Sequence, residues 1–71
     1  MQVLREVGKQ QLVERNGEFL LIERGLPSLT FDQETKDQFI NLSDDEFSVK
    51  AQEKISRDSA IMMLGFYQNS L

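Results

Sequence analysis

The chain has 71 residues, a formal net charge of −4 and neither cysteine nor histidine. Without cysteine it holds no disulfide and no thiolate metal site, and without histidine it lacks the commonest acid–base group at neutral pH. We therefore expect one small domain, residues 1–71, that is not an enzyme and uses no cofactor or metal. A core this small is marginal by itself, so we expect a protein partner, in a homodimer or a hetero-complex.

Charge is unevenly distributed along the chain. Residues 1–26 carry four basic and four acidic side chains, whereas residues 27–71 carry four basic and eight acidic ones. An acidic half suits docking onto a basic protein surface better than broad phosphate binding. The alternative is that the acidic residues serve solubility alone.

The N-terminus does not resemble a secretion signal. Arg5 and Glu6 stand where a signal peptide needs apolar residues. The longest apolar run, residues 60–66, is too short to span a bilayer. We expect a cytoplasmic protein with no membrane contact.

The first 32 residues carry strand and turn patterns. Residues 2–7 alternate in polarity and predict a strand, because Gly8 would interrupt the alternative helix. Asn16-Gly17 is the preferred pair for a two-residue type I′ turn, in which both residues need positive φ. Residues 25–28 form a break at Pro27, and residues 29–31 predict a short last strand.

A turn at Asn16-Gly17 fixes the register of its hairpin. Alternating side chains then divide into two sets, with Val13, Leu20 and Ile22 on one face and Leu12, Phe19 and Leu21 on the other. Both faces are apolar, so we expect the hairpin to be covered on both sides.

The second half predicts helices. Residues 33–40 form a weak candidate, and residues 43–46 form a capping box that starts the next helix. An apolar stripe follows at four-residue spacing, made of Phe47, Ala51 and Ile55. A second cap at Ser56 predicts another helix, whose residues 60–66 are apolar nearly all round and need burial on more than one side.

This order of elements defines the fold class. We expect an α+β domain: an N-terminal antiparallel β-meander or hairpin, followed by two or three C-terminal helices. Residues 1–32 are then mainly β and residues 33–71 mainly α.

Candidate catalytic and metal-binding groups have simpler interpretations. Asp44, Asp45 and Glu46 are explained by the helix cap, and residues 32–37 lack the glycine and the later glutamate of a calcium loop. Met62 and Met63 fit either an adaptable binding surface or ordinary core filling.

One segment resembles the prevent-host-death class of antitoxins. The pattern runs from Gly17-Glu18 through the apolar residues 19–22 and the pair Arg24-Gly25 to Pro27 and a second strand at 29–31. The resemblance covers about a fifth of the chain. It implies a protein that dimerises, binds its operator and holds a toxin.

The C-terminus resembles the start of a helix-turn-helix. Ile61, Gly65, Phe66 and Leu71 occupy the positions of its apolar and glycine residues, and residues 67–70 then begin a recognition helix. The alternative is a C-terminal packing helix that ends near Gly65.

Both resemblances imply a small regulator, an antitoxin and transcriptional autoregulator. The candidates for DNA contact are Arg5, Lys9, Arg57, Gln68 and Asn69. The candidates for contact with a protein partner are Asp44, Asp45, Glu46, Met62, Met63 and Phe66. The alternative is an accessory or inhibitory protein, for example from a phage, that binds one host protein and no DNA.

Overall fold

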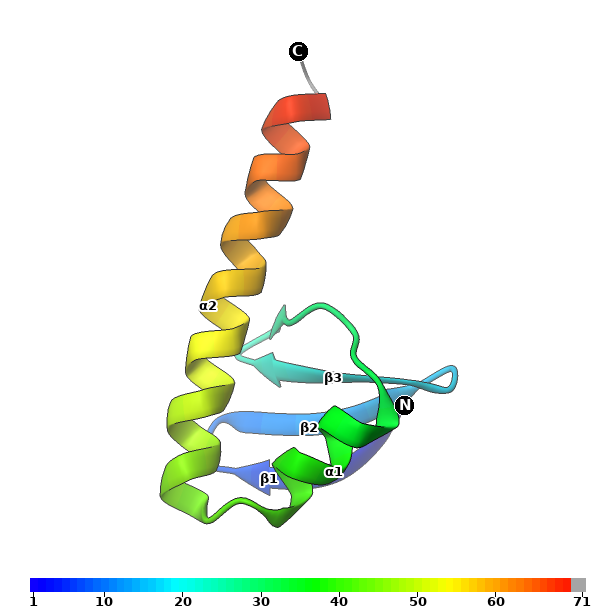
Figure 1. Ribbon diagram of the computed structural model, residues 1–71, viewed down its shortest axis with the longest axis vertical. Coiled ribbons are helices and arrows are strands. Elements are labelled where there is room, and N and C mark those ends of the chain that lie inside the picture. Colours follow the sequence, from blue (N-terminus) through cyan, green and yellow to red (C-terminus); the bar gives the residue numbers. More distant parts are fainter. Residues whose placement is uncertain (70–71) are drawn as a thin grey trace.

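The computed structural model describes residues 1–69 of the chain and the side chains of residues 1–65. Its elements, in order, are β1 (Gln2–Val7), β2 (Gln10–Arg15), β3 (Glu18–Glu23), β4 (Leu26–Pro27), α1 (Gln33–Asn41) and α2 (Asp44–Asn69). The four strands form one antiparallel sheet in the order β1-β2-β3-β4, and the two helices follow it (Figure 1). The predicted α+β meander with C-terminal helices is confirmed.

The β2–β3 hairpin forms as its turn sequence predicts. Asn16 and Gly17 have φ values of 55° and 80°, as a type I′ turn requires. The strands pair Arg15 with Glu18 and continue in that register to the other end of the hairpin. The predicted register is therefore confirmed.

The segment expected to be a break is a second tight turn. Arg24 and Gly25 have φ values of 51° and 80°, and residues 26 and 27 pair back onto β3 as β4. The strand expected at residues 29–31 is reduced to a single bridge between Phe19 and Phe31. The meander thus closes earlier along the chain than predicted, because the hairpin turn lies at residues 24–25.

Both helices pack against the sheet face that carries Leu12 and Leu21. Burying such side chains stabilises the fold by about 1.5–3 kcal/mol each. The buried cluster consists of Leu12, Leu21, Phe39, Phe47, Ala51 and Ile55. The predicted stripe of α2 is confirmed as its core-facing side.

Val13 and Leu20 belong to the opposite sheet face and are also buried, at 0% and 1% exposure. The centre of this second face is therefore excluded from solvent, whereas Ile22 on the same face is only partly buried. The helices account for only one of these faces, because the cluster that they share with the sheet contains Leu12 and Leu21 but neither Val13 nor Leu20.

Helix α2 is continuous from Asp44 to Asn69. The cap expected at Ser56 and the turn expected at Gly65 are both wrong, because the helix runs through these positions. A glycine inside a helix costs only about 1 kcal/mol, so Gly65 does not by itself end it. Leu71, the last position of the helix-turn-helix pattern, lies outside the described residues.

Candidate functional site

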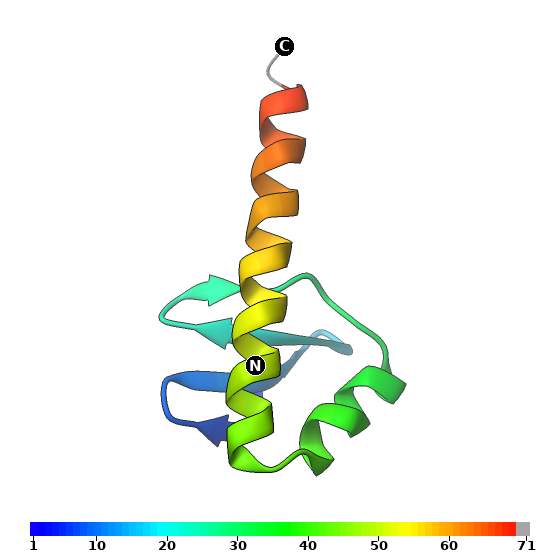
Figure 2. The ribbon, with the colours of Figure 1, turned by 60° about the vertical axis from the view of Figure 1, so that its left-hand side comes forward.

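The C-terminal half of α2 extends away from the sheet and α1 (Figures 1 and 2). Four consecutive residues there are exposed: Ile61 (49%), Met62 (38%), Met63 (58%) and Leu64 (61%). Successive residues of a helix are about 100° apart, so these four side chains surround the helix. We call residues 61–64 the exposed apolar segment. The expectation that this part of the chain is buried on more than one side is wrong for the isolated chain.

The part of α2 that extends past the sheet carries no charged side chain after Asp58. Asp58 is the last charged side chain, and residues 59–71 contain none. The exposed apolar segment therefore offers no ion-pairing group of its own. Exposed apolar surface of this kind typically marks a protein interaction site.

The buried carboxylate of Asp58 anchors α2 just before that point. Asp58 is 3% exposed, and its Oδ2 accepts hydrogen bonds at 2.9 Å from the backbone amide of Leu29 and from the Nζ of Lys54. The sequence does not indicate this role, because the partner Leu29 is 29 positions away. The bond from Leu29 holds α2 to the segment after β4, whereas the bond from Lys54 lies within α2.

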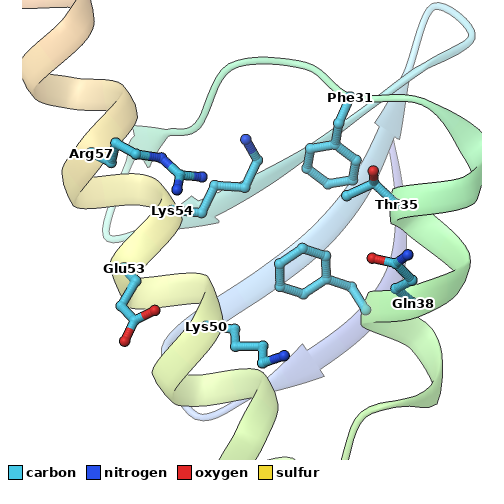
Figure 3. A pocket seen from close by; sticks show the side chains of 8 residues that line it. Phe31, Thr35, Gln38, Lys50, Glu53, Lys54 and Arg57 are labelled. Carbon is cyan, nitrogen blue, oxygen red and sulfur yellow. The ribbon is translucent and has the colours of Figure 1, made fainter.

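A groove of about 440 Å³ lies between α1 and α2 (Figure 3). Three basic side chains of α2 line it, together with two phenylalanines, two uncharged polar side chains and one glutamate. The lining residues are Phe31, Thr35, Gln38, Phe39, Lys50, Glu53, Lys54 and Arg57. Sequence analysis selected only Arg57 of this set, because the groove depends on how the two helices are placed.

Arg5, a candidate for DNA contact, is engaged within the fold. Its Nη1 donates to the carbonyls of Phe39 and Ile40 at 2.7 and 3.1 Å. Its Nη2 donates to Asp44 at 2.9 Å, and its guanidinium lies 4.7 Å from the ring centroid of Phe47. These contacts use Arg5 to hold the end of α1 against the start of α2, so its charge is not free for a phosphate.

The other candidates for DNA contact do not form one described surface. Lys9 lies in the β1–β2 loop and is exposed, whereas Arg57 lies on α2 at the groove. Gln68 and Asn69 belong to the end of α2, and their side chains are outside the described set, as is that of Phe66.

The acidic partner candidates lie at the opposite end of α2 from the methionines. Asp44, Asp45 and Glu46 form the first turn of α2, where negative charge suits the helix dipole. The amide of Glu46 donates to the Ser43 hydroxyl at 3.2 Å, which confirms that half of the predicted capping box. The distance along α2 from Asp44 to Met62 is about 27 Å, so one small surface does not contain both groups.

Two further polar residues have structural roles that the sequence did not indicate. Gln10 is buried, and its Nε2 donates to Glu23 at 2.7 Å and to the carbonyl of Ser48 at 3.1 Å. Asp32 caps α1 by accepting a hydrogen bond from the amide of Thr35 at 2.9 Å. This hydrogen bond lowers the pKa of Asp32 below its ordinary value of 3.8.

Within the described residues, no three acidic side chains gather where they would hold a metal ion. None of the helices in this part of the chain has the length and apolar character needed to cross a bilayer.

The chain matches no protein family, no curated protein and no solved structure. Its function is therefore inferred from the exposed apolar segment and the groove.

Proposed function

We propose that this chain is a small non-catalytic interaction protein that binds another protein through the exposed apolar segment of α2. One observation carries the proposal: Ile61, Met62, Met63 and Leu64 are exposed together on a helix that extends past the sheet. Leaving this much apolar surface in water is unfavourable at about 25 cal/mol per Å². A partner that covers it recovers that free energy.

The distribution of these side chains indicates what the partner offers. A single helix packed alongside α2 covers one stripe and leaves the rest of the circumference exposed. Residues 61–64 surround the helix, so full burial needs an apolar groove that receives it from several sides, as in helix-in-groove recognition. The two methionines suit such a groove, because their flexible side chains adapt to its shape. We therefore favour a groove on a different protein over a simple pair of α2 helices.

An antitoxin is one class of protein that would work in this way. The resemblance at residues 17–31 supports it, and α2 would then be the element that holds the toxin. DNA binding by the same chain has less support, because Arg5 is engaged within the fold and the net charge is −4. The second candidate, an accessory or inhibitory protein that binds one host protein, uses the same helix and no DNA.

The test compares three proteins in solution. Met63→Glu with Leu64→Glu places charge on the exposed apolar segment, and Val49→Glu is the matched control, because Val49 is an exposed apolar residue (57%) at the other end of α2. Without its partner groove, the exposed apolar segment should cause only weak, reversible self-association of the wild type and the control at high concentration in sedimentation, whereas the double variant should remain monomeric with unchanged thermal unfolding.

Amide hydrogen exchange can contradict the proposal. An isolated helix end without tertiary contacts is marginal in water, so residues 61–64 should exchange quickly in the monomer. A monomer at high concentration, in which these amides are protected as strongly as those of the core, contradicts the proposal.

Coexpression with the products of adjacent genes separates the two candidates. An antitoxin rescues cells from a neighbouring product that is toxic alone, and the rescue should fail with the Met63→Glu, Leu64→Glu chain. A gel shift at low salt then tests DNA binding, because the phosphate contribution is strongest there.

A further inference from the structure

The groove between the helices concentrates positive charge on an acidic protein. Lys50, Lys54 and Arg57 lie at positions i, i+4 and i+7 of α2, so they share one helix face, and all three line the groove. They are three of only eight basic residues in a chain of net charge −4. This spacing gives α2 a basic stripe that faces α1.

Two of the three cations are available to a ligand. Lys54 is neutralised by the buried carboxylate of Asp58 at 2.9 Å. The nearest carboxylate oxygen to the Nε of Arg57 is 3.9 Å away, again on Asp58, and the Arg57 side chain is 68% exposed. Lys50 has no ion pair within 4.0 Å in the described part of the chain. Lys50 and Arg57 thus keep most of their attraction for an added anion.

The one acidic lining residue does not extend across the groove. In Figure 3 the Glu53 side chain points outward from α2, whereas Lys50 and Lys54 extend toward α1. The facing wall on α1 is formed by Thr35 and Gln38, which are polar and uncharged. Both groups donate hydrogen bonds readily to a carboxylate.

The floor of the groove is aromatic. Phe31 and Phe39 stack with ring centroids 5.7 Å apart, and both line the groove. Phe31 is only partly buried, and the Nζ of Lys54 lies 5.4 Å from the centroid of its ring, so an apolar group would contact Phe31 beside the Lys54 side chain. A volume of about 440 Å³ lies within the range of small-ligand sites and holds one apolar side chain with a neighbouring carboxylate.

We infer that this groove binds an acidic peptide segment, with an apolar side chain against Phe31 and Phe39 and an adjacent carboxylate between Lys50 and Arg57. A nucleic acid fits less well, because its phosphates continue beyond the groove over a surface of net negative charge. A short segment with one or two carboxylates contacts only the basic stripe. This site is separate from the exposed apolar segment, so the two bind independently.

The experiment is a titration followed by amide chemical shifts of the labelled full-length chain. The probe is an acetylated hexapeptide that alternates leucine and glutamate, and the comparison peptide carries glutamine in place of every glutamate. We expect shifts at Thr35, Gln38, Lys50 and Arg57 with the acidic peptide, weakening with added salt, and at least about fivefold weaker binding of the glutamine peptide.

Charge-reversal variants locate the site. Lys50→Glu should weaken binding of the acidic peptide by about fivefold or more, since an exposed ion pair contributes up to about 1 kcal/mol and reversal adds repulsion. Lys9→Glu makes the same change of charge on an exposed loop and should leave binding within about twofold. Glu53→Gln should strengthen it. Thermal unfolding of each variant verifies that the fold is retained.

Four results would overturn the inference: equal affinity for the acidic and glutamine peptides, equal weakening by Lys9→Glu and Lys50→Glu, shifts confined to residues 61–64, or tighter binding of a single-stranded oligonucleotide than of the peptide. The Met63→Glu, Leu64→Glu chain should bind the peptide unchanged. If the groove does not bind the peptide, the proposed docking of the exposed apolar segment still stands. If that docking is disproved, the inference about the groove still stands.

Discussion

The buried carboxylate of Asp58 accepts a partly buried hydrogen bond of 2.9 Å from the backbone amide of Leu29, between α2 and the segment after β4. Lys54, one turn earlier on α2, offsets the buried charge. The helix is thus fixed to the sheet at Asp58, and the exposed apolar segment begins one turn later. The first part of α2 is thus packed against the sheet, and residues 61–64 are left exposed to a partner.

Asp58→Ala should destabilise the fold by about 2–3 kcal/mol, because it leaves the Leu29 amide and the Lys54 ammonium without their acceptor. Asp58→Asn should cost less, since its amide oxygen still accepts from Leu29. Urea unfolding measures both. Glu53→Ala, on an exposed face of α2, is the control and should stay within about 0.5 kcal/mol of the wild type; equal effects of the two alanine variants would contradict a structural role for Asp58.

Arg5→Ala should destabilise the fold by about 2 kcal/mol, because the guanidinium donates to two carbonyls of α1 and to Asp44 and stacks on Phe47. Arg5→Lys should recover only part of this, because an ammonium lacks the planar fork of arginine. Chemical denaturation checks the order of the three proteins. Lys9→Ala is the control, and a lysine variant as stable as the wild type would show that the geometry of Arg5 is unimportant.

Local patterns predicted the elements that depend on neighbouring residues. Asn16-Gly17 predicted the hairpin and its register, because positive φ at two successive residues leaves few alternatives. The four-residue spacing of Phe47, Ala51 and Ile55 predicted the buried side of α2, because a helix needs one apolar stripe to pack. In each case the residues that form the pattern lie within one hairpin or about two turns of one helix.

Contacts between distant segments were not predictable in this way. Arg5 reaches Asp44 across 39 positions, and the groove is lined by residues of both α1 and α2 together with Phe31. The apolar residues 60–66 were expected to be buried, since their composition suits a core. Within the residues that the structure describes, no element covers residues 61–64. The apolar composition therefore indicated that this segment needs burial but did not indicate what buries it.

Lowering the pH should remove the contribution of the α1 cap. The pKa of Asp32 is lowered in the folded chain by the hydrogen bond from the Thr35 amide. A carboxylate with a lowered folded pKa stabilises the fold above its unfolded pKa, and this stabilisation is lost as the pH falls through the folded pKa. The stability of the wild type should therefore decline below about pH 4 relative to Asp32→Asn, whose amide oxygen caps at every pH.

Thermal unfolding from pH 7 to pH 2 measures this difference. Asp32→Ala, which has no capping oxygen, should be less stable than Asp32→Asn throughout. A difference between the wild type and Asp32→Asn that stays constant over the whole range would exclude the cap as the cause.

Arg24→Asn should stabilise the protein. Arg24 has a φ of 51°, in the left-handed region that costs most residues about 1 kcal/mol, whereas asparagine adopts it readily. The substitution also makes this turn match Asn16-Gly17, which already has the favoured pair. We expect a gain of a few tenths to about 1 kcal/mol in urea unfolding. Asn16→Arg should lose a similar amount, and a loss on Arg24→Asn would show that the Arg24 side chain makes a stabilising contact that outweighs its backbone strain.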